Sequence, residues 1–237
     1  MPQDRRALRA ELTAQRRKVL IGLDFDCTLT VKHFYKAVAW GFGGGNPGHP
    51  HYAEMAEELA KLDLPKTSGQ YLDDLVACLD CMITAKPDGE AAFRELFRSF
   101  FLGGDERIKL ITDWMKAETS KGNVFAVVTA GQASAVTYVL QLAVPEWIPY
   151  LPSGRVWDSQ QSRHAVGAVI LHKLMILRDI CPDAKVVVLV DDALAKEDVS
   201  PQWLGATGAV CYNGLQYEDC GLTAEHCQKV SELVAAA

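Results

Sequence analysis

Two aspartates separated by a single residue are the most chemically suggestive feature of this 237-residue sequence. Asp24 and Asp26 directly follow a short apolar run, Val19–Leu23. A carboxylate in such a position can act as a nucleophile, transfer a proton, or bind a hard divalent cation through its oxygens. An aspartate after a strand can also do no more than cap a helix or close an Asx turn, so the pair alone does not decide between chemistry and structure.

Polar residues also end two further apolar runs. Thr129 follows the run 124–128, and the pair Asp191-Asp192 follows Val186–Val190. Continuous apolar runs are typical of strands that are buried on both faces of a parallel sheet. The ligand site of an open α/β sheet lies beyond the carboxyl ends of its strands. We therefore expect these polar residues to meet at one edge of the sheet, although they are far apart in the sequence.

Helical patterns between the apolar runs predict the α/β class, with a Rossmann-like parallel sheet as the core and helices on its faces. Core helices are expected at 107–119, 133–142 and 172–180, and an amphipathic helix is expected at 4–18. Lys173 lies at the start of the helix that leads to the third strand, and a lysine in such a position is by itself most often a solvated helix residue.

The segment between the first two strands, residues 33–102, contains no comparable apolar run. Its patterns predict helices at 52–62, 68–85 and 89–101, after a glycine-rich loop at 41–50. A segment of this length is too small to be an independent catalytic domain, and we expect it to form a small, mainly helical cap. Residues 1–32 and 103–237 would then form the α/β core.

The order of the polar residues resembles that of a known family. The motif D-x-D-x-T occupies residues 24–28, and Thr129, Lys173 and the pair Asp191-Asp192 follow it at successive elements. This arrangement resembles the haloacid dehalogenase (HAD) superfamily of phosphotransferases. The resemblance covers about residues 18–198, and within that range the segment 33–102 matches in position only.

The resemblance implies a phosphatase that hydrolyses a phosphate monoester. Asp24 would attack phosphorus and form an aspartyl-phosphate, and Asp26 would act first as general acid and then as general base. Thr129 would donate a hydrogen bond to the transferring phosphoryl group, and Lys173 would stabilise its charge. An acid at position 26 favours phosphate esters over carbon–halogen bonds, because only an alkoxide leaving group needs that proton.

The resemblance also implies which residues bind the cofactor Mg2+ and the phosphate group. Asp192 is expected as the direct metal ligand among the later acids, and Glu197 as a weaker outer acid. The implied metal set is Asp24, Asp26 through its backbone carbonyl, Asp191 and Asp192. The implied phosphate-binding set is Thr28, Thr129, Ala130, Gly131 and Lys173. We also hypothesise that the loop 41–50 contacts the leaving group, together with His33, Tyr35, His49 and His51.

Two other functions stay open at this stage. One is a phosphatase of phosphoproteins or nucleic-acid ends, which would need an open lid, and the other is a catalytically inactive HAD-like scaffold that binds a partner through the cap. A cysteine-dependent phosphatase is excluded, because none of the seven cysteines is followed by arginine six residues later. The stretch 43–48 fits G-x-G-x-x-G without a clear strand before it, and Cys78 and Cys81 form a lone C-x-x-C, so neither a dinucleotide site nor a zinc site is expected.

Composition is ordinary for a soluble globular protein, with 49% hydrophobic and 23% charged residues and a net charge of −6. The acidic balance argues against bulk attraction to nucleic acid or an anionic membrane. The resemblance, together with the expected cap, implies a small phosphorylated substrate as the partner. The sequence does not indicate an oligomeric state. Without an evident secretory signal, a spanning segment or an even set of cysteines, we expect a cytoplasmic protein.

Overall fold

A computed structural model gives the fold over most of the chain. The residues that it describes are 19–38, 75–152, 156–158, 169–182, 184–196, 199–217 and 221–237. The expected helices at 4–18 and 52–62, and the glycine-rich loop 41–50, lie outside the described residues.

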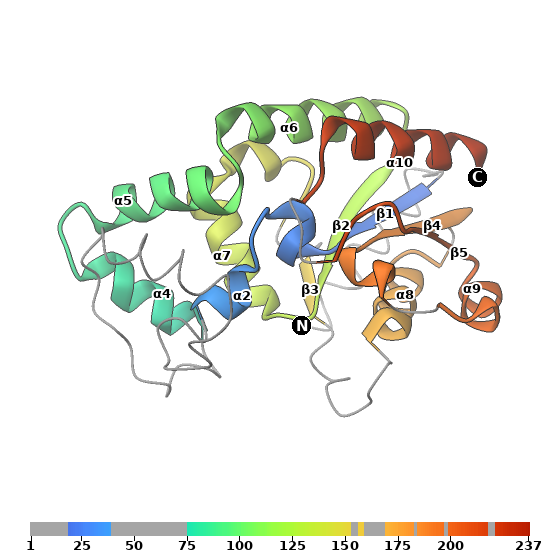
Figure 1. Cartoon of the computed structure of the whole chain (residues 1–237), viewed down its shortest axis with the longest axis horizontal. Helices are drawn as coiled ribbons and strands as arrows, with labels where there is room; N and C mark the ends of the chain where they lie inside the picture. The colour runs from blue at the N-terminus through green and yellow to red at the C-terminus, as the bar shows by residue number, and fades with distance from the viewer. Residues whose placement is uncertain are drawn as a thin grey trace.

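The described residues form a five-stranded parallel sheet with the strand order β3-β2-β1-β4-β5. The strands are β1 (Val19–Leu23), β2 (Val124–Thr129), β3 (Val156–Asp158), β4 (Val186–Val190) and β5 (Ala209–Tyr212). Leu23 is in register with Val127 on one side and Val190 on the other, so β1 ends level with β4, whereas β2 continues two residues further to Thr129. The first strand is therefore central, and the residues after it emerge between the ends of β2 and β4 (Figure 1).

Helices cover both faces of this sheet, as expected for the α/β class (Figure 1). The helices are α2 (Phe34–Lys36), α4 (Leu75–Thr84), α5 (Gly89–Leu96), α6 (Asp105–Ser120), α7 (Ala133–Ala143), α8 (Val169–Ile180), α9 (Pro201–Thr207) and α10 (Ala224–Ala236). Shorter helical turns are η1 (Phe25–Leu29), η4 (Phe97–Phe101), η5 (Pro145–Trp147) and η8 (Asp192–Ala195). In Figure 1, α6 and α10 lie above the sheet, and α8 and α9 lie below it.

Alternate residues of the strands supply the two halves of the core, because successive side chains of a strand point to opposite faces. Ile21 and Val127 pack with α6, α7 and α10 in one buried cluster. Leu20 and Leu189 pack with α8 on the opposite face. Burial on both faces explains why the strands are continuous apolar runs in the sequence.

Gly22 lets α8 pack unusually close to the central strand. A Cβ added at this position would overlap the end of the Leu177 side chain, lying 2.6 Å from its Cδ2 atom. Leu177 is fully buried and lies four residues, or about one helical turn, after Lys173. Because Gly22 has no side chain, α8 can pack close to β1, and this close packing places Lys173 at the edge of the sheet.

The described part of the segment 33–102 is helical and attached to the core by an aromatic cluster. Phe34 is buried, and its ring centroid lies 5.9, 5.3 and 5.2 Å from those of Phe25, Phe97 and Phe101. Edge-to-face pairs at such distances are favourable in addition to their burial. The division of the chain into a core and a cap stays a prediction.

Several elements differ from the sequence-based expectation or were absent from it. The helix expected at 89–101 is α5 followed by the wider turn η4, and α8 begins at Val169, so that Lys173 lies in its second turn. Strands β3 and β5 were not predicted, because three and four residues are too few to stand out as apolar runs. Helices α9 and α10 were not predicted either.

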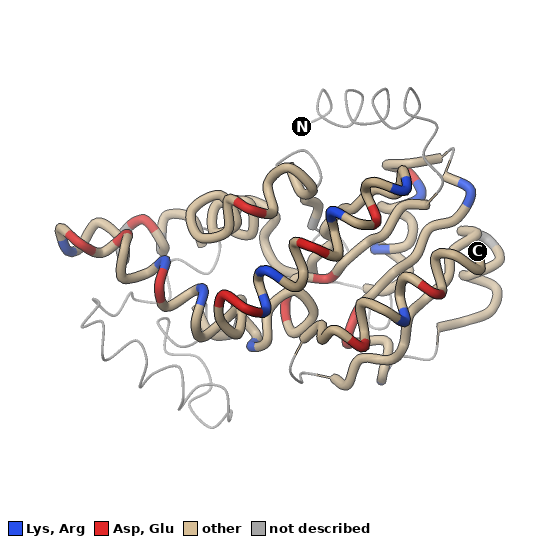
Figure 2. Tube along the Cα trace, turned by 90° about the horizontal axis from the view of Figure 1, so that it is seen from above, with Lys and Arg blue, Asp and Glu red and all other residues tan. Residues whose placement is uncertain are grey.

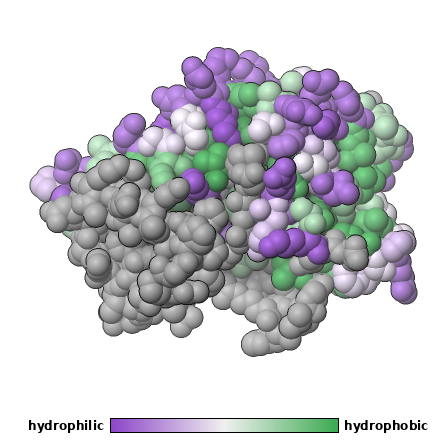
Figure 3. Space-filling model, in the orientation of Figure 1, coloured by the Kyte–Doolittle hydropathy of each residue, from purple (hydrophilic) through white to green (hydrophobic). Residues whose placement is uncertain are grey.

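The outer surfaces of the helices carry charges of both signs. Viewed from above, Lys or Arg and Asp or Glu alternate along the helices over one face (Figure 2). They include the pairs Lys109–Asp113 and Lys229–Glu225, four residues apart on α6 and α10. Hydrophilic side chains accordingly line the top of the view in Figure 3, and hydrophobic ones gather at its right side. Among the described residues no helix combines the length and the apolar character needed to cross a bilayer.

Candidate active site

The chain leaves β1 in an extended conformation and then turns sharply. The Asp24 N–H donates to Val190 O at 2.9 Å, which continues the pairing of β1 with β4 by one residue. Two residues after Phe25, Cys27 adopts φ 57° and ψ 8°, in the left-handed region that favours glycine. Thr30 stabilises this turn, because its hydroxyl accepts from Cys27 N–H at 3.0 Å and donates to Lys32 O at 2.6 Å. The turn returns the chain toward the sheet edge, so that Asp24 and Asp26 stay close to it.

Lys173 joins the ends of β1 and β4. Its Nζ lies 2.8 Å from Asp24 Oδ1 and 2.6 Å from Asp191 Oδ2, and the lysine side chain is only 2% exposed. Burial alone would lower the pKa of Lys173, but the two carboxylates more than offset it and raise the pKa above its usual range. The lysine is therefore a permanent buried cation at the point predicted from the sequence.

Three carboxylates surround this single cation. Oxygens of Asp24, Asp191 and Asp192 lie within 4.8 Å of one another, and all three side chains are buried. Burial, opposed by Lys173, together with the two neighbouring acids raises the pKa of Asp24 well above its usual range. Asp24 Oδ1, although paired with Lys173, has no partner with hydrogen-bond geometry among the described residues. The cluster thus has more negative charge than Lys173 balances, and its oxygen donors fit a hard divalent cation such as Mg2+.

The two later acids have different surroundings. Asp191 Oδ2 accepts from Lys173, and its Oδ1 accepts from the Ala193 N–H at 2.9 Å. Both oxygens of Asp191 are therefore engaged by the protein itself. The expectation that Asp192 is the direct metal ligand stays a prediction.

Asp26 has partners that differ from those of the acidic cluster. Its Oδ1 accepts from the Tyr35 N–H at 2.9 Å and lies 3.2 Å from His33 Nδ1. Burial would raise the pKa of Asp26, but His33 and the Tyr35 N–H lower it below its usual range. The side chain of Asp26 is thus not part of the metal-binding group, and only its backbone carbonyl was expected there.

The loop after β2 contributes the residues expected to bind phosphate. The Gly131 N–H donates to Thr129 Oγ1 at 2.9 Å, and Thr129 is fully buried whereas Ala130 is exposed. A Cβ added at Gly131 would lie 3.2 Å from Thr129 Oγ1 and 3.8 Å from Asp26 Oδ2. The loop therefore lies beside Asp26, and glycine leaves space there that a side chain would fill.

Thr28 links the turn after β1 to the residues after β4. It is fully buried, and its Oγ1 accepts from the Asp192 N–H at 3.3 Å. This contact fixes the backbone of Asp192 relative to the D-x-D-x-T motif. Thr28 was expected to bind phosphate, and the contact supports an additional role in positioning Asp192.

Arg107, at the start of α6, was not predicted to belong to the site. Its guanidinium donates to four backbone carbonyls, with distances of 2.7 to 3.2 Å. The acceptors are Thr28 O, Leu29 O, Leu102 O and Leu222 O. Arg107 therefore connects the turn after β1 to the end of η4 and to the loop before α10. Because the acceptors are backbone carbonyls that lie far apart in the chain, no motif in the sequence identifies Arg107 as their donor.

Several expected residues cannot be placed. Glu197, His49 and His51 lie outside the described residues, and so does the loop 41–50. The helix α4 includes Cys78 and Cys81, but the positions of their side chains are not described. Cys27 is buried beside the site, as expected.

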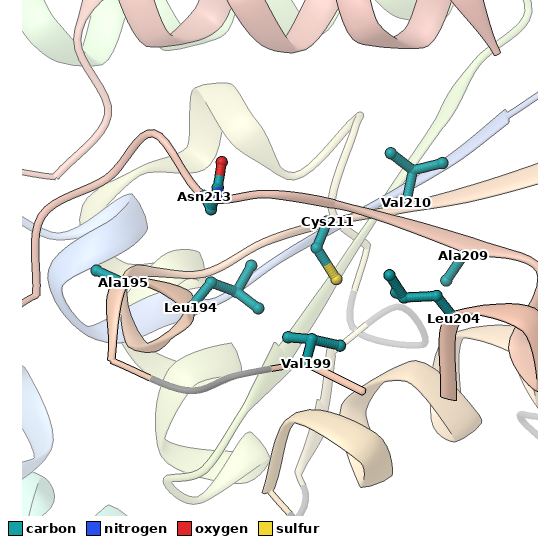
Figure 4. A pocket seen from close by; sticks show the side chains of 8 residues that line it. All are labelled: Leu194, Ala195, Val199, Leu204, Ala209, Val210, Cys211 and Asn213. Carbon is teal, nitrogen blue, oxygen red and sulfur yellow. The ribbon is translucent and has the colours of Figure 1, made fainter. Parts of the chain in front are cut away.

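A pocket lies among residues of η8, α9 and β5, and Figure 4 shows the side chains that line it. Leu194, Val199, Leu204 and Cys211 direct mainly apolar side chains into it (Figure 4). Burial and the charge of Asp191 raise the pKa of the Cys211 thiol to about 11, so the thiol is protonated at neutral pH. Its described lining contains no acidic cluster and no cation, which separates it from the site around Lys173.

Known proteins were compared with this chain. No protein-family model and no curated protein sequence matches it. Similar solved structures include the HAD domain of the effector protein Lem4 from Legionella pneumophila, with a TM-score of 0.47 and 10% identity over 93% of this chain and 96% of that one. The effector Ceg4 of the same bacterium has a TM-score of 0.44 and 16% identity over 92% and 95%. A HAD family hydrolase from Deinococcus radiodurans, solved with phosphate and sodium bound, has a TM-score of 0.35 and 15% identity over 94% and 95%. The grounds for a functional proposal are the site residues themselves.

Proposed function

We propose that this protein is a phosphatase of the HAD type, which hydrolyses a phosphate monoester through an aspartyl-phosphate on Asp24. The observation that carries the proposal is the buried Lys173 between Asp24 and Asp191, with the Asp192 carboxylate beside them. A helix cap or an Asx turn requires none of this, because one aspartate suffices for each. A buried cation and three carboxylates at one sheet edge instead suit the transfer of an anionic group.

In the first step an oxygen of Asp24 attacks phosphorus, and the bond between phosphorus and the ester oxygen breaks. Asp26 in its protonated form donates a proton to the departing oxygen, so that an alcohol leaves. Lys173 balances the negative charge on the nucleophile and on the phosphoryl group as it moves. Thr129 and the N–H groups of the loop 129–131 are proposed to bind the phosphoryl oxygens.

In the second step water attacks the aspartyl-phosphate. Asp26, now ionised, accepts a proton from that water, and the bond between phosphorus and the Asp24 oxygen breaks. The products are inorganic phosphate and the original Asp24 carboxylate, and Asp26 carries a proton again. Burial opposes ionisation of Asp26, but His33 and the Tyr35 N–H lower its pKa overall, which favours the ionised form that begins this step.

Asp24, Asp192 and the backbone carbonyl of Asp26 are proposed to hold Mg2+, with Asp191 supporting them. When bound, Mg2+ would neutralise charge on the phosphoryl oxygens and allow an anionic nucleophile to approach an anionic substrate. A cap formed by residues 33–102 would shield the intermediate from bulk water and favour a small phosphorylated metabolite.

The test is hydrolysis of p-nitrophenyl phosphate by the purified chain in the presence of Mg2+. We expect turnover that EDTA removes and that Mg2+ restores. Asp24→Asn should abolish it, and mass spectrometry should find phosphate on the peptide containing Asp24 in the wild type alone. Asp192→Asn should raise the Mg2+ concentration needed for half-maximal rate by roughly tenfold or more.

Asp113→Asn is the matched control, because Asp113 is an exposed residue of α6 paired only with Lys109 in the described structure. It should leave turnover unchanged. Turnover that survives Asp24→Asn would refute the nucleophile. A folded wild-type chain that hydrolyses no phosphate ester would favour the inactive scaffold, and comparable rates on phosphopeptides would favour a phosphatase of phosphoproteins.

A further inference from the structure

The two carboxylate oxygens of Asp26 lie in different surroundings. Oδ1 accepts from the Tyr35 N–H at 2.9 Å and faces His33 Nδ1 at 3.2 Å. Oδ2 lies on the side of the loop after β2, where a methyl group on Gly131 would be 3.8 Å away. One oxygen is therefore held by the protein, and the other is directed toward the loop that is proposed to bind the phosphoryl group.

Buried aromatic rings hold both partners of this contact in place. Phe25 lies between Asp24 and Asp26 in the sequence, and Phe34 lies between His33 and Tyr35. The two rings meet edge to face at 5.9 Å, and both side chains are buried. Because each ring faces the core, its neighbours in the chain are held next to one another at the site. The side chain of His33 is 19% exposed, so it lies at the boundary between the core and the substrate side.

We infer that His33 is a positioning residue, which holds Oδ1 of Asp26 so that Oδ2 exchanges the proton in both steps of the reaction. The inference rests on the proposed function and adds a residue to its machinery. With Nδ1 protonated, His33 donates to Oδ1. His33 offers this contact to Oδ1 in both steps, while Oδ2 gives its own proton to the leaving oxygen and then receives one from the attacking water.

The second donor matters because of the torsion of the aspartate side chain. Rotation about the bond to the carboxylate is broad and roughly two-fold, so a single hydrogen bond fixes it poorly. The Tyr35 N–H alone would allow the two oxygens to turn out of the required plane. Together with His33 it restrains the group, and proton transfer depends first on such geometry.

The test compares two variants of His33 on two aryl phosphates. His33→Leu removes the donor, whereas His33→Asn places an amide N–H where Nδ1 is. The substrates are p-nitrophenyl phosphate, whose leaving group needs little protonation, and phenyl phosphate, whose more basic leaving group needs more. For His33→Leu we expect kcat/KM to fall about tenfold or more with phenyl phosphate and less than about threefold with p-nitrophenyl phosphate. His33→Asn should stay within about threefold of the wild type on both.

A role limited to folding would lower both rates equally, so the ratio between the substrates separates positioning from stability. His226→Leu is the matched control, because it makes the same replacement at the start of α10 and should leave the ratio unchanged. Thermal unfolding of each variant verifies that the chain is folded. Equal losses on both substrates, or a His33→Asn variant no better than His33→Leu, would overturn the inference.

The result also distinguishes this inference from the proposed function. If Asp24→Asn is inactive and His33→Leu does not change the ratio, the positioning role alone is wrong. If Asp24→Asn remains active, the nucleophile is wrong and the role of His33 falls with it.

Discussion

Replacing Gly22 with alanine tests whether close packing of α8 on β1 is what brings Lys173 to the site. The added Cβ would overlap the methyl groups of the fully buried Leu177. Overpacking of this kind costs about 1–3 kcal/mol. Exchanging glycine for alanine within a strand returns roughly 0.5–1 kcal/mol. We therefore expect a net loss of about 0.5–2 kcal/mol in the free energy of unfolding, measured by urea denaturation.

The same change should lower activity more than it lowers stability. A displaced α8 carries Lys173 with it, and misplacement of a catalytic group by about 1 Å can cost roughly 100-fold in rate. For Gly22→Ala we expect kcat/KM on p-nitrophenyl phosphate to fall at least about tenfold while most of the protein stays folded.

A second substitution makes this prediction sharper. Leu177→Ala alone should cost about 2–5 kcal/mol, because it leaves a cavity in the core. In the double variant the new methyl group occupies part of that cavity, so the combined loss should be smaller than the sum by about 1 kcal/mol. Gly205→Ala is the control, since a Cβ added there meets no atom within 4 Å. Strict additivity, or wild-type activity of Gly22→Ala, would refute the packing explanation.

Three further predictions concern the turn after β1 and the packing of α10. Arg107→Lys should destabilise the protein by about 2–4 kcal/mol in urea denaturation, because one ammonium group cannot replace a guanidinium that donates to four carbonyls. Cys27→Gly should be more stable than Cys27→Ala by about 1 kcal/mol, because the backbone there has φ 57°. Glu118 is buried, which would raise its pKa, but three side-chain hydrogen bonds lower the pKa below its usual 4.5. Its ionised form therefore adds stability above about pH 4.5 that is lost as the pH falls through the folded pKa. Unfolding of Glu118→Gln at several pH values should show a deficit of about 1–2 kcal/mol at pH 7 that shrinks below pH 4.5.

The sequence alone predicts the class of the fold. It also predicts which edge of the sheet holds the candidate site. Three buried strands are recognisable in the sequence as apolar runs. A polar residue ends each run, because the side chains leave the apolar interior where a strand ends. The bounds of β1 and β4 agree with those runs to the residue. Parallel pairing then requires the strand ends to lie at one edge, which is why Lys173 contacts both Asp24 and Asp191.

Features that depend on contacts between distant backbone atoms could not be predicted in the same way. Arg107 looks like any helical arginine in the sequence, because its partners are carbonyls, which every residue has. Gly22 looks like a weak point in a strand, and only the position of Leu177 explains it. Strands β3 and β5 are short edge strands whose residues do not form a run long enough to separate them from a loop. The local pattern of apolar and polar residues indicates which segments are buried. The contacts of Arg107 and Gly22 depend instead on how those buried segments pack against one another.

Asp24 and Asp26 illustrate this difference at the site itself. They are chemically identical and two residues apart, so the sequence alone assigns them different roles only through a family resemblance. The structure places the two carboxylates in different surroundings. Burial, with the charges of Asp191 and Asp192, raises the pKa of Asp24, whereas His33 and the Tyr35 N–H outweigh burial and lower the pKa of Asp26. Because a raised pKa favours the protonated form, the proposed nucleophile Asp24 needs the charge of a bound cation as well as that of Lys173 to stay ionised, whereas the lowered pKa of Asp26 favours the ionised form that the proposed second step requires.

The chain leaves β1 between the two aspartates, and this separates their surroundings. In a continued strand, residues two apart point to the same face and would share one environment. Instead the Asp24 N–H makes the last contact with β4, and the wide turn η1 begins at Phe25. Asp24 stays with the cation at the sheet edge, and Asp26 lies beside His33 and the loop after β2. The end of the strand therefore places two neighbouring carboxylates in different surroundings, as their proposed roles as nucleophile and proton carrier require.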